Sequence, residues 1–421
     1  MSARNVLERC DELAAISALP DGLIERTYLT VEHKAANATV AEWMAEAGLA
    51  TWQDAAGNVC GRLEGAEAGL PALLLGSHLD TVPSAGRYDG ILGVMIAIEV
   101  AAMVKRSGRV LPFALEVIGF GDEEGTRFGA TLLGSRALAG TWDDAWWGRT
   151  DSEGVSLYEA FGAFGLDPEG IGRAARRPDE IIGYLEAHIE QGPILEQRGR
   201  ALGLVASIAG ARRLQVTVTG RAAHAGTPYD MRRDALAGAS EAIVAVEALA
   251  PGLGLIATVG RIGAQPGAVN VVAGAVTFSL DVRAASDEVR DDGLAVLMAE
   301  VGKVCARRGL SLGVEHTHTA ETVHCDEAMT RALEKAIAKT GDVEPLSLFS
   351  PAGHDAMAVA ALTRVGMLFV RCAGGVSHHP DESVLEDDVE RAIEAMYEAV
   401  LYLESVLDEQ LDEQQVVEVR G

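Results

Sequence analysis

Two short apolar segments in the first third of the chain each run into polar residues. PALLLGSHLDT spans residues 71–81, LPFALEVIGFGDEEG spans 111–125, and both end in histidine or acidic side chains. Continuous apolar runs of this length are typical of strands buried on both faces. Between them, residues 90–106 have helical spacing and are followed by Ser-Gly, a common helix stop. The pattern predicts a strand, a crossover helix and a second strand of an α/β sheet.

A different pattern begins near residue 205. The stretches 211–220 and 273–284 alternate apolar and polar residues, as half-exposed antiparallel strands do. Helical patterns at about 230–249 and 286–308 accompany them. Strands and helices in this arrangement predict a separate α+β insertion.

After residue 320 the helix–strand pattern returns, which predicts a return of the chain to the first sheet. We therefore expect residues 1–204 and 321–421 to form one discontinuous α/β domain. Its sheet is expected to be mixed, mostly parallel and flanked by helices. Residues 205–320 are expected to form the inserted α+β domain.

The composition favours a globular protein and argues against nucleic-acid and membrane partners. A chain of 421 residues with 48% hydrophobic residues and 13 prolines is typical of a compact, two-domain globular protein. The net charge of -27 repels nucleic acid and anionic membranes. No apolar run approaches the ~20 residues of a membrane span. The N-terminal residues lack a signal-peptide core, and the five cysteines show no CxxC pairing. We expect a cytoplasmic protein without nucleic-acid or membrane partners.

Polar side chains gather where the predicted strands end. Four stretches carry them: GSHLD (76–80) with DG (89–90), GDEEG (121–125), EAHIEQG (186–192) and SHHP (377–380). Ligands of open α/β sheets bind at the carboxyl ends of the strands, so we expect these stretches to converge. Neutral imidazole and carboxylate together suit Zn²⁺ or Mn²⁺ and need no thiolate. The pattern favours a metal-dependent hydrolase.

The two adjacent glutamates are expected to have different roles in the site. Neighbours on an extended backbone point to opposite faces, so Glu123 and Glu124 are not equivalent ligands of one ion. One is expected to bind metal and the other to move protons. Asp80, two residues after His78, is expected to accept the second ring N–H of His78 and fix its tautomer. Taken singly, such residues are more often packed or solvated, and it is their co-occurrence at several strand ends that favours a site.

Seven stretches, in chain order, carry a family resemblance. They are GSHLDTVPSAGRYDGILGV, GDEEGTRFGATLLGS, EAHIEQGPILE, TGRAAHAGTPYDMRRDAL, AVNVVAGAVTFSLDVRA, SPAGHDAM and GGVSHHPDE. They resemble the dizinc aminoacylase/carboxypeptidase (M20-type) peptidase family, and more closely its amidohydrolase branch. That branch contains allantoate amidohydrolases, N-carbamoyl-L-amino-acid hydrolases and β-ureidopropionases. The resemblance covers nearly the whole chain.

The resemblance implies a binuclear metal site. His78, Asp89 and His188 would hold one divalent ion, and Asp89 would bridge to a second ion held also by Glu124 and His379. The expected ions are Zn²⁺ or Mn²⁺, and Co²⁺ or Ni²⁺ also suit such donors.

The resemblance also assigns the residues around the ions. Glu123 would be the general base for a water molecule bridging the two ions. His378 is expected beside the site or at the surface, not among the ligands. His354 is expected either to support the site or to serve folding alone.

The resemblance places substrate contacts mainly in the insertion. His224, Asn270 and Arg283 would bind substrate, with Gln191 and Gly353 as weaker candidates. A guanidinium binds a carboxylate through two hydrogen bonds, which lysine cannot copy. The commoner role of an arginine at a strand end is a surface ion pair.

The reaction implied by the resemblance is hydrolysis of a C–N bond in a small ureido acid. Allantoate, yielding ammonia and carbon dioxide, is the first candidate, and the alternatives are an N-carbamoyl-L-amino acid or a β-ureido acid. A metallo-exopeptidase or aminoacylase is less favoured, because His188 stands where exopeptidases of the family carry an acid. A metal-free scaffold would require loss of the ligands or the base. By analogy, the insertion is expected to form a lid and to mediate a homodimer.

Overall fold

The computed structural model describes residues 2–420, and the side chains of residues 2–407. The chain divides into two compact units. The first unit comprises Met1–Ala206, Cys325–Leu348 and Gly353–Gly421, and the inserted unit comprises Ser207–His324 and Phe349–Ala352. The insertion predicted at residues 205–320 therefore extends to His324 and also includes the short segment Phe349–Ala352.

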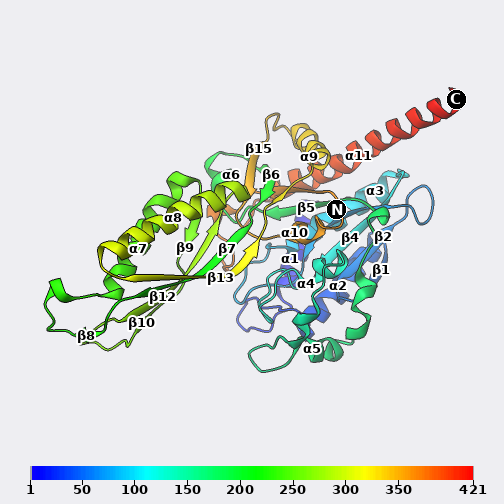
Figure 1. The fold of residues 1–421 in the computed structure, drawn as a ribbon. Helices are drawn as coiled ribbons and strands as arrows, with labels where there is room; N and C mark the ends of the chain where they lie inside the picture. The colour runs from blue at the N-terminus through cyan, green and yellow to red at the C-terminus, as the bar shows by residue number, and fades with distance from the viewer. Residues whose placement is uncertain (1, 421) are drawn as a thin grey trace. The chain divides into compact units, whose positions relative to one another are not determined.

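The first unit is built on a mixed sheet (Figure 1). The sheet follows the order β1-β2-β4-β3-β5-β16-β6-β14, with β14 at Val323–His324, and β15 also pairs with β6. The other strands are β1 (Ala50–Gln53), β2 (Val59–Leu63), β3 (Ala72–His78), β4 (Ala114–Phe120), β5 (Ile181–Ile189), β6 (Leu202–Ile208), β15 (Leu346–Ser350) and β16 (Val365–Val370). The central strands β4, β3, β5 and β16 are parallel, and antiparallel pairs flank them on both sides. The expected α/β class with a mixed sheet is confirmed, and its parallel part is confined to the centre.

Helices pack against one face of this sheet in a single large core. They are α1 (Ala3–Ala14), α2 (Val31–Glu46), α3 (Ile91–Ser107), α9 (Glu327–Lys339) and α11 (Glu386–Arg420). The helix α3 is buried along almost its whole length, since it contacts the sheet as well as α1 and α11. A helix that is apolar all round requires such a position.

Alternation along the strands sends the polar side chains to the opposite face. In β5, Leu185, Ala187 and Ile189 belong to the helix-covered core. Successive side chains of a strand point to opposite faces, so Glu186 and His188 face away from that core. His188 lies near the carboxyl end of β5, and His78 ends the neighbouring parallel strand β3.

The inserted unit contains an antiparallel sheet in the order β10-β12-β7-β13, with β9 also pairing with β12. Two helices share its apolar core. The elements are β7 (Ala211–Thr219), α7 (Ala235–Leu249), β9 (Ile256–Thr258), β10 (Ile262–Gln265), β12 (Ala275–Arg283), α8 (Asp287–Arg307) and β13 (Ser311–Ala320). Buried and half-exposed residues alternate strictly along β12, as a sheet with one covered face requires. The expected α+β insertion is confirmed.

One helix corrects the expectation that no segment is long enough to cross a membrane. Among the described residues, Ala235–Leu253 meets that test by length and composition. Ala239, Ala242 and Val246 pack in the core of the inserted unit, and Glu241 pairs with Arg308. One face of the segment therefore packs in that core while most of its residues are not fully buried, and a single helix of this kind is weak evidence for a membrane span.

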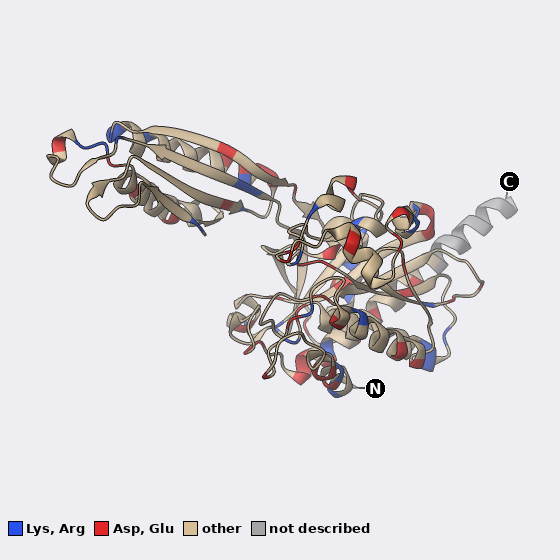
Figure 2. Cartoon of the chain, turned by 90° about the horizontal axis from the view of Figure 1, so that it is seen from below, with Lys and Arg blue, Asp and Glu red and all other residues tan. Residues whose placement is uncertain are grey.

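Charge is spread along the chain. Acidic side chains outnumber basic ones by 62 to 35. Figure 2 shows both kinds scattered over helices and loops, while the long strands of the inserted unit carry few of either. The negative net charge therefore does not come from one acidic segment.

Candidate metal centre

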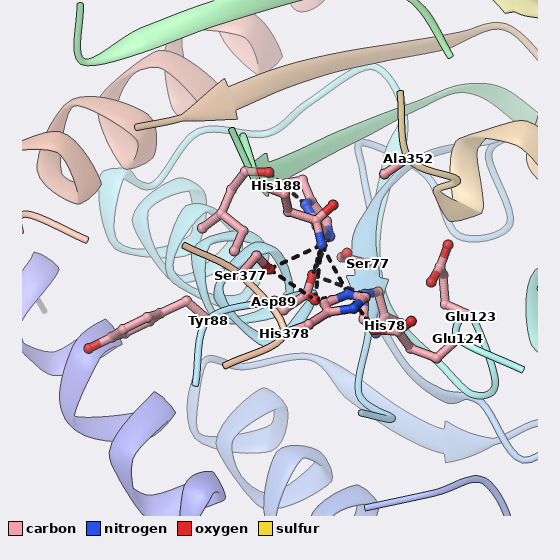
Figure 3. A network of polar contacts seen from close by, with 12 residues as sticks. Ser77, His78, Tyr88, Asp89, Glu123, Glu124, His188, Ala352, Ser377 and His378 are labelled. Atoms are coloured by element: carbon pink, nitrogen blue, oxygen red, sulfur yellow. Dashed lines mark hydrogen bonds and ion pairs between the residues drawn. The ribbon is translucent and has the colours of Figure 1, made fainter. Parts of the chain in front are cut away.

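Two histidines from neighbouring strands meet one aspartate at the carboxyl edge of the sheet. Nε2 of His188 lies 3.2 Å from Oδ1 of Asp89, and Nε2 of His78 lies 3.8 Å from the same oxygen. The three donor atoms lie within 4.8 Å of one another (Figure 3). All three residues are at most 4% exposed. A buried set of two imidazoles and a carboxylate is the donor chemistry of a Zn²⁺ or Mn²⁺ site.

Backbone carbonyls orient both rings. Nδ1 of His78 lies 3.0 Å from the carbonyl oxygen of Asp80, and Nδ1 of His188 lies 2.9 Å from that of Ile189. A carbonyl can only accept, so each Nδ1 carries the proton when the ring is neutral. The lone pair of each Nε2 then points toward Asp89, as a metal ligand requires.

The carboxylate of Asp80 has a different main role from the predicted one. It accepts the backbone N–H of Glu123 at 3.0 Å and that of Glu124 at 3.2 Å. Its nearer contact to the His78 ring is 3.6 Å, so the strong bond to that ring comes from the Asp80 backbone. Asp80 therefore positions the two glutamates as well as the histidine.

A second group of donors lies on the other side of Asp89. Nε2 of His378 is 2.9 Å from Oδ2 of Asp89 and 3.3 Å from Oε1 of Glu124. These three donor atoms also lie within 4.8 Å of one another. Asp89 thus offers one oxygen to each group, which is the geometry of a carboxylate shared by two cations.

The family resemblance implies His379 at this ligand position, but His378 lies there in the structure. The side chain of His379 is 58% exposed, and its Nδ1 accepts the backbone N–H of Asp381. His378 adopts a left-handed backbone with φ of 53°, which turns successive side chains of the loop in different directions. The SHHP stretch alone does not show which ring turns inward.

The pKa of the histidine nearest each oxygen of Asp89 is raised, whereas burial lowers the pKa of His78. Burial alone would lower the pKa of His188, but the hydrogen bond and charge of Asp89 raise it to about 9. Hydrogen bonds to Asp89 and Glu124 raise the pKa of His378 to about 10. Protons held this firmly occupy places where metal cations fit.

Glu123 stands beside both donor groups in a fixed loop. Its N–H is held by Asp80, and its carbonyl accepts the N–H of Leu132 at 3.2 Å. Burial, and after it the nearby carboxylates of Glu124 and Asp355, raises the pKa of Glu123 well above its ordinary value. A carboxylate with a raised pKa holds a proton more readily than an ordinary glutamate, which suits a group that moves protons.

The two weaker candidates of the first unit also lie at this site. Nε2 of Gln191 donates to both oxygens of Asp89, at 3.1 and 3.0 Å. Gly353 lies against Glu123, because a Cβ built on Gly353 would be 3.5 Å from Oε1 of that glutamate. His354 packs edge-on against the ring of His188, with ring centroids 4.4 Å apart.

Two buried acids near the site were missed in the sequence. Glu186 accepts hydrogen bonds from Ser77 at 2.8 Å and from the backbone N–H of Ala356 at 3.1 Å. Glu382 accepts from the backbone of the Asp89 loop. An acid inside an otherwise apolar strand, as Glu186 is, must be paired when buried, and that signal was available in the sequence.

Two predicted substrate residues lie side by side in the inserted unit. The short strands β8 (Ala223–His224) and β11 (Val271–Val272) pair with His224 opposite Val271. The carbonyl of Asn270 accepts the N–H of Ala225 at 3.0 Å, so His224 and Asn270 flank the same hairpin. In Figure 1, β8 lies at the tip of the inserted unit.

Arg283 lies at the other end of the same unit. It is the last residue of the nine-residue strand β12, whereas the hairpin precedes the first residue of that strand. Eight steps along a strand span about 26 Å. Arg283 pairs with Asp281 at 2.8 Å and donates to the carbonyl of Pro351 at 2.6 Å. Within one subunit, His224 and Arg283 cannot therefore contact one small molecule together.

Residues 74–402 match the family described as peptidase family M20/M25/M40. The chain is 41% identical over 413 residues to allantoate deiminase 2 of Glycine max, covering 90% of this chain and 85% of the relative. It is 39% identical to N-carbamoyl-L-amino acid amidohydrolase of Geobacillus stearothermophilus, covering 94% and 97%. Among solved structures, a hydantoinase/carbamoylase-family amidase from Burkholderia multivorans superposes with a TM-score of 0.86 at 33% identity, covering 95% and 97%.

A buried group of histidines and acids at the carboxyl edge of a mixed sheet, together with an α+β insertion, defines a metal-dependent hydrolase. The chain belongs to peptidase family M20/M25/M40. Within that family it is an amidohydrolase acting on C–N bonds other than peptide bonds.

Proposed function

We propose that the chain hydrolyses allantoate, a small ureido acid, and releases ammonia and carbon dioxide. The observation that carries this proposal is the pair of donor groups that share Asp89, with Glu123 beside them. The identity of 41% to allantoate deiminase 2 over most of both chains supports allantoate as the substrate.

The same geometry supports two divalent ions in each subunit. His78, Asp89 and His188 would hold one, and Asp89, Glu124 and His378 the other. Divalent ions held by these residues would supply the positive charge that polarises the scissile carbonyl and lowers the pKa of a nearby water molecule. Zn²⁺ and Mn²⁺ are the first candidates, and Co²⁺ and Ni²⁺ suit the same donors.

Glu123 performs the proton transfers in this proposal. Its carboxylate takes a proton from the water that attacks the ureido carbonyl and delivers it to the departing nitrogen, because an amine anion is a poor leaving group. The carbamic acid released breaks down to ammonia and carbon dioxide. In sum, one ureido group and one water yield one amine, one ammonia and one carbon dioxide, so atoms and charge balance.

Residues of the inserted unit are proposed to bind the substrate carboxylate. Arg283 has a planar fork of donors that its pairing with Asp281 leaves only partly used. His224 and Asn270 lie about 26 Å along the strand direction from Arg283, beyond the reach of one molecule of this size. We therefore propose a homodimer through the inserted unit, in which His224 and Asn270 serve the partner's site. Gln191 and Gly353 complete the proposed contacts beside the metals.

An N-carbamoyl-L-amino acid is the second candidate substrate. The relative from Geobacillus stearothermophilus supports it, since the match covers 94% of this chain and 97% of the relative. Both substrates offer a ureido carbonyl and a carboxylate.

The five cysteines form no disulfide, which supports a cytoplasmic location.

The test is ammonia release by purified protein loaded in turn with Mn²⁺, Zn²⁺, Co²⁺ and Ni²⁺. Allantoate should give the highest kcat/KM, and N-carbamoyl-L-amino acids and dipeptides should be turned over more slowly. Turnover of N-carbamoyl-L-amino acids with none on allantoate would reject the first candidate in favour of the second. Absence of bound metal after incubation with each ion would reject the hydrolase mechanism altogether.

A further inference from the structure

The side chain of Glu382 is buried beneath the loop that carries Asp89. Only 3% of the residue is exposed. Its Oε1 accepts the backbone N–H of Tyr88 at 2.8 Å and that of Asp89 at 3.2 Å. Its Oε2 accepts the hydroxyl of Ser377 at 2.9 Å. One carboxylate thus joins two loops that are almost 300 residues apart in the chain.

The Asp89 loop is shaped to admit this carboxylate. A Cβ built on Gly86 would lie 2.1 Å from both Cδ and Oε1 of Glu382, so no larger residue fits there. A Cβ built on Gly90, at the other end of the loop, would lie 2.4 Å from the ring of His78. The loop therefore packs between Glu382 on one side and a candidate metal ligand on the other.

The two loops that Glu382 joins each supply one donor to the second group, which consists of Asp89, Glu124 and His378. Asp89 follows Tyr88 directly, and His378 follows Ser377 directly. The hydroxyl of Ser377 is also 3.5 Å from Oδ2 of Asp89, the oxygen that faces His378. The first group depends less on this link, because its two rings are oriented by backbone carbonyls.

We propose that Glu382 is the positioning residue that sets Asp89 and His378 at the correct separation to bind the second metal ion. This inference rests on the binuclear site proposed above. Partners that orient metal ligands without touching the ion commonly change metal affinity ten- to hundredfold when removed. No ion pair of the described side chains involves Glu382, so its contribution is the geometry of three hydrogen bonds rather than a pairing with a cation.

The variants distinguish geometry from simple burial. Glu382→Gln keeps the length of the side chain: its amide oxygen accepts from both backbone N–H groups, and its NH₂ donates to Ser377. Glu382→Asp keeps the charge but is one methylene too short to reach both loops. Glu382→Ala removes all three bonds. Asp388→Asn is the matched control, because Asp388 is a buried carboxylate of the same unit that accepts two bonds from Arg371 and contacts none of the candidate ligands.

The experiment is competition for Mn²⁺ between metal-free protein and a chromogenic chelator. We expect the wild type to bind two ions. In Glu382→Ala and Glu382→Asp, the affinity for one ion should fall about ten- to hundredfold, and the affinity for the other should change less than about threefold. Glu382→Gln and Asp388→Asn should stay within about threefold of the wild type. High Mn²⁺ should restore kcat to the alanine variant.

Four results would overturn the inference. Wild-type affinity for both ions in Glu382→Ala would do so and leave the proposed function standing. Equal weakening in Asp388→Asn would show a general loss of stability instead of positioning. A wild type that binds no ion would remove the proposed function, and this inference with it. If the alanine variant does not fold, the test is the comparison of the other two variants. Glu382→Gln should bind Mn²⁺ more tightly than Glu382→Asp, and the reverse order contradicts the inference.

Discussion

Asp89 is the residue on which both donor groups depend. It presents Oδ1 to His188 and Oδ2 to His378, and Gln191 donates to both oxygens. Burial alone would raise its pKa, but the hydrogen bonds from His188 and His378 hold that pKa well below the ordinary range. The carboxylate therefore stays ionised across the physiological range, as the proposed binding of two cations requires.

Substitution of Glu123 tests whether the two adjacent glutamates have different roles. Glu123→Gln removes the proton acceptor but keeps the size of the side chain. We expect kcat to fall about 10²- to 10⁴-fold while two metal ions remain bound, because general-base catalysis contributes that much. Steady-state ammonia release together with metal analysis measures both effects. Glu153→Gln, an exposed position of the same unit, is the control, and unchanged kcat in Glu123→Gln would refute the general-base role.

The choice between two adjacent histidines gives a second prediction. His378→Ala should lose one of two ions, since its Nε2 lies between Asp89 and Glu124. His379→Ala should keep both, because that ring is exposed and faces Asp381. Metal content by atomic emission after dialysis compares the two variants directly. Loss of metal in His379→Ala with retention in His378→Ala would restore the assignment made from sequence.

At the scale of elements, the histidine in the first turn of α2 links stability to pH. His33 is fully buried, its Nδ1 accepts the N–H of Leu29 at 3.2 Å, and its ring stacks on Phe164. Burial, with a smaller contribution from Arg26, lowers its pKa to about 3. In the unfolded chain a histidine titrates near pH 6.5. The folded state therefore gains stability above pH 6.5 and loses it as pH falls toward 3.

We expect His33 to reduce the free energy of unfolding by about 1.4 kcal/mol for each pH unit below 6.5. The metal-free wild type should lose about 2 to 3 kcal/mol more than His33→Gln between pH 6.5 and pH 4.5. Urea unfolding followed by tryptophan fluorescence measures this loss in the first unit, where all five tryptophans lie. Equal losses in both proteins would show that His33 titrates normally in the folded chain.

At the scale of the whole molecule, the separation of His224 from Arg283 predicts a site completed by a second subunit. Glu123→Gln and His224→Ala are each expected to be inactive as purified homodimers. Mixed after subunit exchange, they should regain about a quarter of wild-type turnover, because half of the dimers are hybrids with one intact site.

The control for this experiment mixes Glu123→Gln with Glu124→Ala. Both changes lie in the first unit, so every hybrid site keeps one defect and no activity should return. Absence of recovery in the first mixture, with subunit exchange shown by differently tagged chains, would contradict the shared site. Mass measurement in solution establishes the dimer independently.

Local sequence patterns predict the class of fold and most of the residues that meet at the candidate site. Apolar runs that end in His78 and in the Glu123–Glu124 pair are local patterns, and strand ends of one parallel sheet meet at one edge whatever the rest of the chain does. The alternation in 273–284 likewise predicts a half-exposed strand without any knowledge of its partners. The spacing of apolar residues and the order of the predicted elements are sufficient to predict such strands and the residues at their ends.

Which atoms face each other depends on packing between distant parts of the chain. His378 replaced His379 because a left-handed turn, not the residue type, sets the direction of each ring. Asp80 and Glu382 act through backbone N–H groups of loops far away in the chain, and no spacing rule encodes such contacts. His224 and Arg283 belong to one inserted unit in the sequence, yet the length of a strand separates them. Side-chain direction and long-range distance arise from packing of the whole chain, so a local pattern cannot contain them.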